Sequence, residues 1–137
     1  MSFDPTRDYP LGTQRPDLVS TPGGLPLADV TLEALRAGRL SADEIRATPE
    51  TLRMQGAVAL AAGRAQLAEN FERAVELAAV PDDLLLSIYT ALRPGRATAA
   101  ELEGWAARLD GFAATKTAAF VREAAIAYAD RGLLARG

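Results

Sequence analysis

Apolar side chains recur at helical spacing along most of the chain after residue 30. One stripe runs through Leu60, Leu67, Phe71 and Val75, with charged residues on the opposite face. This is the spacing of a helix that buries one side against the rest of a protein. No segment alternates apolar and polar residues with the period of two that a strand requires. The pattern therefore predicts an all-α fold, a compact domain of about four main helices over residues 31–137.

Caps and breakers predict where these helices begin. Thr31 precedes a short helix that Gly38 ends, and Thr48 followed by Pro49 opens a much longer one. We expect the longer helix to continue to Ala79, because no strong breaker intervenes. Its glycines, at positions 56 and 63, each weaken a helix by about 1 kcal/mol relative to alanine, and they can let another backbone approach closely.

Three further helices are predicted toward the end of the chain. The first starts at Pro81 with Leu85, Ile88, Tyr89 and Leu92 on its buried face. Thr98 and Glu101 have capping-box spacing and open the second helix. The Asp110-Gly111 pair breaks or bends the chain before the last helix, which runs from about Phe112 to Arg131. This helix carries the apolar residues Ala119, Phe120, Ala124, Ala127 and Tyr128.

Residues 1–30 hold five of the eight prolines and are predicted to form an extended arm. Proline fixes φ and pushes the preceding residue toward extended backbone. The arm also carries aliphatic side chains, which a free linker lacks, so it lies either on its own helices or on a partner chain. We expect the arm to contact a partner subunit, with residues 31–137 as the helical domain.

Several residues are candidates for a subunit interface. Tyr9 is a candidate interface anchor because the proline that follows it restricts the backbone at this point. Trp105 is the only tryptophan and either packs in the core or anchors an interface, where tryptophan is over-represented. Arg93 and Arg96 flank a Pro-Gly turn, where they can cap a helix, pair with a partner's carboxylate or contact an anion. The candidate set is Tyr9, Pro10, Leu11, Leu18, Arg93 and Trp105.

The amino-acid composition argues against most kinds of catalysis by this chain alone. The chain has no cysteine and no histidine, so it lacks a thiolate nucleophile and the commonest general base. Its net charge of −3 argues against binding to a phosphate backbone. Asp82 and Asp83 are better explained by the helix dipole than by acid–base work. No apolar run approaches the length of a membrane span, and no signal peptide is recognisable. We predict no catalytic, cofactor-binding or metal-binding residue on this chain.

Three segments in register resemble the small subunit of adenosylcobalamin-dependent diol and glycerol dehydratases. They are Asp8-Tyr9-Pro10-Leu11-Gly12-Thr13, Asn70-Phe71-Glu72-Arg73-Ala74 leading to Ile88-Tyr89-Thr90-Ala91-Leu92-Arg93-Pro94, and Ala118-Ala119-Phe120-Val121-Arg122-Glu123-Ala124-Ala125. Their order and spacing match from Asp8 onward. Gly95, where the family more often has an aromatic, and Asp110-Gly111 depart from the pattern and affect local packing only.

The resemblance implies a non-catalytic subunit of a hydro-lyase that removes water from a 1,2-diol by radical chemistry to give an aldehyde. In such enzymes adenosylcobalamin lies between large and medium subunits, the large subunit holds a monovalent or divalent cation, and the small subunit packs on the large one in a dimer of heterotrimers. A reactivating factor can act on the whole enzyme. The resemblance places the complex in the cytoplasm, either free or inside a bacterial microcompartment, and leaves the choice between glycerol and propane-1,2-diol open. Without the resemblance, a stand-alone helical scaffold or homo-oligomeric adaptor fits the same residues.

Overall fold

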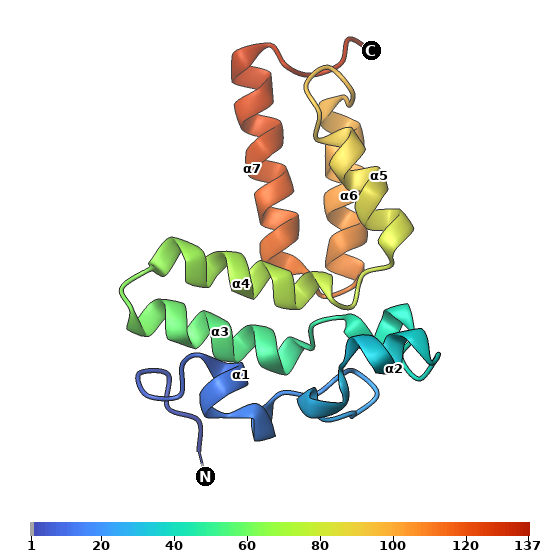
Figure 1. Ribbon diagram of the computed structural model, residues 1–137. Helices are drawn as coiled ribbons and strands as arrows, with labels where there is room; N and C mark the ends of the chain where they lie inside the picture. Colours follow the sequence, from blue (N-terminus) through green and yellow to red (C-terminus); the bar gives the residue numbers. More distant parts are fainter. Residues whose placement is uncertain (1) are drawn as a thin grey trace. The chain divides into compact units, whose positions relative to one another are not determined.

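Helices make up both units into which the chain divides, Met1–Ala78 and Ala79–Gly137. The structure, a computed structural model, describes residues 2–137 (Figure 1). Within that range there is no strand, and the only sheet-like pairing is an isolated bridge between Ser20 and Pro26. The predicted all-α fold class is confirmed. Residues 1–30 and 31–78, which the sequence analysis assigned to an arm and to the helical domain, lie together in the first unit.

The first unit is built on a helical hairpin, α3 (Pro49–Ala61) and α4 (Ala65–Leu77), which lie side by side. The prediction of one helix from Thr48 to Ala79 was wrong. Gly63 adopts a left-handed φ of +75°, and the amide of Arg64 donates to the carbonyl of Ala59 over 2.9 Å, which closes α3. Gly56 then lets the two helices approach closely, because a Cβ there would lie 3.2 Å from the Cβ of Phe71.

Short elements complete the first unit. They are α1 (Leu11–Gln14), η1 (Pro16–Leu18), η2 (Leu27–Asp29), α2 (Leu32–Arg36) and η3 (Ala42–Ile45). Residues 2–30 are thus only partly extended, since they contain three helical turns. The caps predicted at Thr31 and Thr48 are confirmed: the Thr31 hydroxyl accepts from the Ala34 amide, and that of Thr48 accepts from the Thr51 amide. Ser41, which has capping-box spacing with Glu44, precedes η3 but makes no side-chain cap hydrogen bond.

The second unit contains α5 (Asp82–Ala91) and a hairpin of α6 (Ala99–Gly111) and α7 (Thr115–Arg131). Its largest fully buried side chains are Leu102, Leu109 and Val121. The guanidinium of Arg122 on α7 bonds to the carboxylates of Glu103 and Asp110 on α6 at distances of 2.8 to 3.1 Å. Apolar burial and this ion-pair network both join the two helices of the hairpin.

The predicted buried face of α5 was partly wrong, and α7 also leaves a large aromatic side chain exposed. Tyr89 on α5 is 60% exposed and Phe120 on α7 is 47% exposed. Leu84 and Ile88 are the buried residues of α5, and Thr117, Ala118 and Val121 are those of α7. Both helices carry apolar residues around much of their circumference, so spacing alone does not select the buried side.

The connection between α6 and α7 differs from the expected one. The break falls after Gly111 as predicted, but α7 begins at Thr115 and not near Phe112. The left-handed residue of the turn is Ala113, with φ of +59°, so an alanine takes the position that glycine usually fills.

The capping box of α6 gives a stability prediction. The Thr98 hydroxyl accepts from the Glu101 amide at 3.2 Å, and the Glu101 carboxylate accepts from the Thr98 amide at 2.8 Å. Thr98→Ala should lower the free energy of unfolding of the second unit by about 1 kcal/mol, measured by urea denaturation. Ser87→Ala, which removes an exposed hydroxyl bonded to the Asp83 carbonyl, should change it by less than about 0.5 kcal/mol. Equal effects would contradict the assigned role of the cap.

Candidate subunit interface

The N-terminal arm, here residues 2–30, is held against the rest of the first unit by the buried side chain of Leu11 and by a hydrogen bond from Thr21. Leu11 is buried, with 6% of its surface exposed. The Thr21 hydroxyl donates to the carboxylate of Glu44 on η3 and accepts from the Leu25 amide at 3.0 Å. Gly23 lies directly beneath this carboxylate, where any Cβ would collide with it. The arm therefore packs on its own unit, one of the two placements that the sequence allowed.

A cluster of charges fixes the first turns of the arm. The Arg15 guanidinium pairs with Asp8 at 3.1 Å and with Asp17 at 2.9 Å. Hydrogen bonds from Arg15 hold the pKa of Asp17 below its usual range, and Asp17 in turn raises the pKa of Arg15. Asp4 accepts from the hydroxyl and the amide of Thr6, which lowers its pKa to about 2. The cluster orders the segment that leads to Tyr9.

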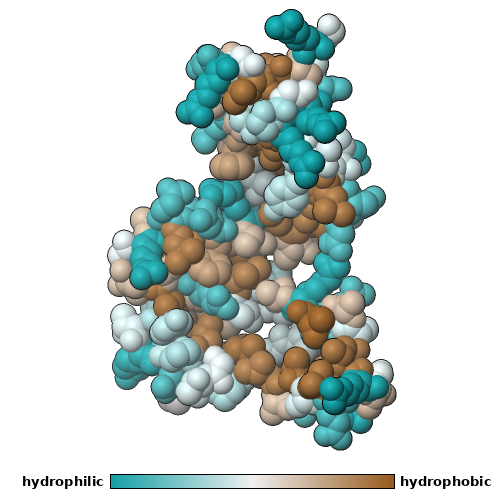
Figure 2. Space-filling view, turned by 45° about the horizontal axis from the view of Figure 1, so that its top comes forward, coloured by the Kyte–Doolittle hydropathy of each residue, from teal (hydrophilic) through white to brown (hydrophobic). Residues whose placement is uncertain are grey.

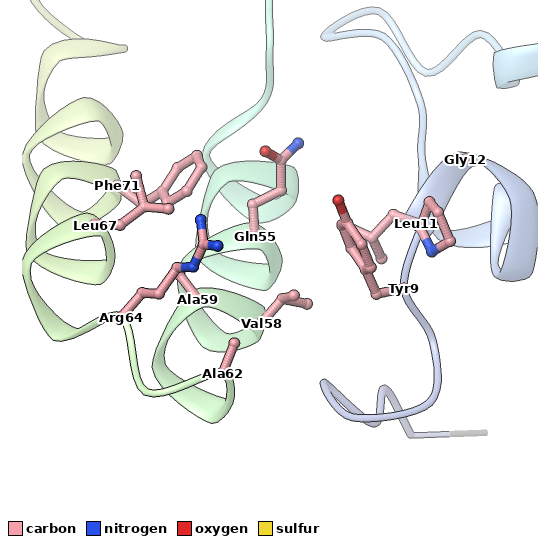
Figure 3. Close-up of a pocket in the computed structure, with 11 residues that line it drawn as sticks. Tyr9, Leu11, Gly12, Gln55, Val58, Ala59, Ala62, Arg64, Leu67 and Phe71 are labelled. Atoms are coloured by element: carbon pink, nitrogen blue, oxygen red, sulfur yellow. The ribbon is translucent and has the colours of Figure 1, made fainter.

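A largely apolar cavity of about 550 Å³ lies between the arm, α3 and the start of α4. Figure 3 shows Tyr9 and Leu11 on the arm across from Gln55 and Val58 of α3, with Leu67 and Phe71 on α4 behind them. Its polar groups are the Tyr9 hydroxyl, the Gln55 amide and the Arg64 guanidinium. Such a lining can bury an apolar side chain, while its few polar groups can bond to the backbone that carries that side chain.

The six predicted interface residues fall into two groups. Tyr9, Pro10 and Leu11 line the same cavity in the first unit, and Leu18 is half-buried in η1. Tyr9 is 64% exposed, whereas its neighbour Leu11 faces inward. In the second unit Arg93 is exposed, and Trp105 is half-buried with the Arg108 guanidinium 5.2 Å from its ring centroid.

Other apolar side chains on the surface were missed by the sequence analysis. Figure 2 shows hydrophobic residues reaching the surface among the hydrophilic ones. Leu60, expected in a buried stripe, is 63% exposed, and Leu86 and Ile126 are 66% and 65% exposed. Leu86 falls outside the Leu85–Ile88–Leu92 stripe, and this off-stripe position was the available signal. Single exposed apolar residues are ordinary on a protein surface, and only where they adjoin one another do they mark a contact region.

Two further properties concern the described residues as a whole. No group of three or more metal-ligating side chains gathers within residues 2–137. No helix in the same range is both long enough and apolar enough to cross a membrane.

The charge cluster of the arm gives a pH prediction. Because the pKa values of Asp4 and Asp17 are lowered, their stabilising contribution is fully present above the ordinary value of 3.8 and is lost as the pH falls through the lowered values. The Nε–H resonance of Arg15, which bonds to Asp17, should stay constant on acidification from pH 7 and change only below the ordinary carboxyl value of 3.8, measured by NMR. A midpoint at or above 3.8 would contradict the ion pairing. Arg39, an exposed arginine of the first unit, is the control resonance.

Comparison with known proteins agrees with the resemblance found in the sequence. Residues 5–135 match the family model described as dehydratase small subunit. The propanediol dehydratase small subunit of Citrobacter freundii is 50% identical over 125 residues, which cover 90% of this chain and 73% of that protein. The propanediol dehydratase small subunit of Salmonella typhimurium is also 50% identical over 125 residues, 90% of this chain and 72% of that protein. The chain belongs to the dehydratase small-subunit family.

Proposed function

We propose that the chain is the small, non-catalytic subunit of a coenzyme-B12-dependent diol dehydratase, a hydro-lyase that converts a 1,2-diol to an aldehyde. The observation that carries this proposal is the family match over residues 5–135, together with half identity to two propanediol dehydratase small subunits. The names of these relatives favour propane-1,2-diol over glycerol as the substrate of the complex.

The proposed role of the chain is structural: it packs on the large catalytic subunit. Several large apolar side chains are exposed on each unit, and a partner subunit could bury them. In the first unit, Tyr9 projects at the edge of an open cavity, as an aromatic anchor at an interface does. We therefore place the partner contact of the first unit around Tyr9 and Pro10.

We assign the cofactor and the cation to the other subunits. Adenosylcobalamin supplies the radical chemistry when it is bound to the complex, and the protein around it supplies position and shielding. Two of the cavities within residues 2–137 measure about 550 Å³ and 570 Å³, a size typical of sites for small organic ligands. We assign no residue of this chain to the cofactor.

The finer assembly is proposed on the same grounds. The partners are the large and medium subunits in a dimer of heterotrimers, and a reactivating factor can act on the holoenzyme. The complex belongs in the cytoplasm, free or inside a microcompartment.

Co-expression tests the proposal. Expressed with the large and medium subunits of the dehydratase, the tagged chain should purify as one complex that forms aldehyde from propane-1,2-diol when adenosylcobalamin is added. Failure of the three chains to co-purify would overturn the assignment. A defined complex of this chain with itself, unchanged by the other subunits, would favour the homo-oligomeric adaptor instead.

A pair of adjacent substitutions separates assembly from folding. Tyr9→Ala removes a mostly exposed ring, so it should leave helicity unchanged and lower retention of the chain in the complex at least about tenfold if the ring is an interface anchor. Leu11→Ala removes a buried side chain and should destabilise the first unit by about 2 to 5 kcal/mol. Circular dichroism during urea denaturation and size-exclusion chromatography of the complex measure the two effects. Retention of Tyr9→Ala at the wild-type level would exclude Tyr9 from the interface.

A further inference from the structure

A second open cavity, a groove of about 570 Å³, runs along the second unit between α5 and α6. It is distinct from the cavity beside Tyr9, which belongs to the first unit. We call it the Trp105 groove. It is lined by Ser87, Thr90, Ala91, Arg96, Ala97, Glu101, Gly104, Trp105 and Arg108.

The groove occupies a face of α6 that does not pack in the core. The core stripe of this helix is Leu102, Ala106 and Leu109, each at most 1% exposed. A second stripe, Glu101, Gly104, Trp105 and Arg108, has the spacing i, i+3, i+4, i+7 and lines the groove along its length. The helix thus presents two separate faces, and the fold of this unit uses only one of them.

Gly104 has no role in the packing of its own unit. Nothing lies within 4 Å of the position that its Cβ would occupy, and its backbone is ordinary helix. A glycine in the middle of a helix costs about 1 kcal/mol relative to alanine. Gly56 differs, because there the close approach of Phe71 accounts for the missing side chain. At Gly104 the missing side chain only deepens the groove beside the indole, which suits close approach by another molecule.

The charges around the groove favour an acidic occupant. Within residues 2–137, neither Arg96 nor Arg108 forms an ion pair, although the chain as a whole is acidic, with a net charge of −3. The one carboxylate of the groove, Glu101, accepts from the Thr98 amide at 2.8 Å. Two guanidinium groups therefore remain available to carboxylates of an approaching chain.

The rest of the lining suits a side chain better than a small polar molecule. The hydroxyls of Ser87 and Thr90 already donate to the carbonyls of Asp83 and Leu86, both at 2.9 Å. Ala91, Ala97 and the Trp105 ring present apolar surface. Arg108 lies over the indole ring, and tryptophan and arginine are both among the residues enriched in interface hot spots.

We propose that the Trp105 groove is a docking site for an acidic segment of the large dehydratase subunit. The segment places one aliphatic or aromatic side chain over Gly104 against Trp105, and its carboxylates pair with Arg96 and Arg108. This inference rests on the proposed function, because it takes the large subunit as the partner. It adds a contact on the second unit to the one placed around Tyr9 on the first.

The test uses the only tryptophan of the chain as a reporter. The full-length small subunit is labelled with fluorotryptophan and mixed with unlabelled large and medium subunits, and the fluorine NMR signal of Trp105 is followed. Binding in the groove should change the chemical shift of this signal, whereas broadening alone would report only the larger size of the complex. The affinity of the wild type should also fall as the salt concentration rises, because charge pairs at a rim are screened.

Two variants and a matched control examine the groove itself. Gly104→Leu fills the groove, and Arg96→Glu with Arg108→Glu reverses its charge; each should weaken binding to the large subunit at least about tenfold. Arg39→Glu with Arg136→Glu makes the same charge change at two exposed positions elsewhere and should bind like the wild type. Gly104→Leu adds a better helix former in open space, so circular dichroism should show that it folds.

The outcomes separate this inference from the function on which it rests. If the wild type binds but the Trp105 signal stays unchanged and both groove variants bind normally, the groove assignment is overturned and the proposed function stands. If the wild type binds no large subunit, the proposed function fails, and the groove assignment fails with it. A Trp105 signal that shifts when the small chain alone is concentrated would assign the groove to a second copy and overturn the proposal.

Discussion

The small size of the buried side chains is the constraint on which the rest of this structure depends. Seven of the fifteen buried hydrophobic residues described are alanine, which contributes little area on burial. Helices joined through alanine and glycine must lie close together, as α3 and α4 do where Gly56 meets Phe71. Many of the larger side chains, among them Leu60, Leu86 and Ile126, are left on the surface, where only another protein can bury them.

Local signals in the sequence predicted helix starts well and helix ends less well. The caps at Thr31, Thr48 and Thr98 were predicted because a cap needs only a side chain and the next turn of backbone. The end of α3 was missed because Gly63 alone is tolerated within a helix. Only the packing of α4 back on α3 makes the left-handed conformation the favourable one. The choice of buried face on α5 and α7 is a tertiary property of the same kind.

The candidate contact surfaces, too, could be predicted from the sequence only in part. Tyr9, Pro10 and Leu11 were found because proline and an aromatic in an aliphatic segment form a recognisable pattern, and they do share a cavity. That Leu11 faces inward while Tyr9 is exposed could not be read from three adjacent residues. The significance of Gly104 was likewise hidden, because a glycine without a packing role is recognisable only when the space around it is known.

The left-handed turn at Ala113 has a consequence for how this hairpin could evolve. An alanine held at φ of +59° carries a backbone penalty of about 1 kcal/mol that glycine would avoid. Nothing in the contacts described for the α6–α7 hairpin requires its methyl group. Replacing Ala113 with glycine would therefore stabilise this connection. In evolution, that single change could compensate for destabilising substitutions elsewhere in the subunit.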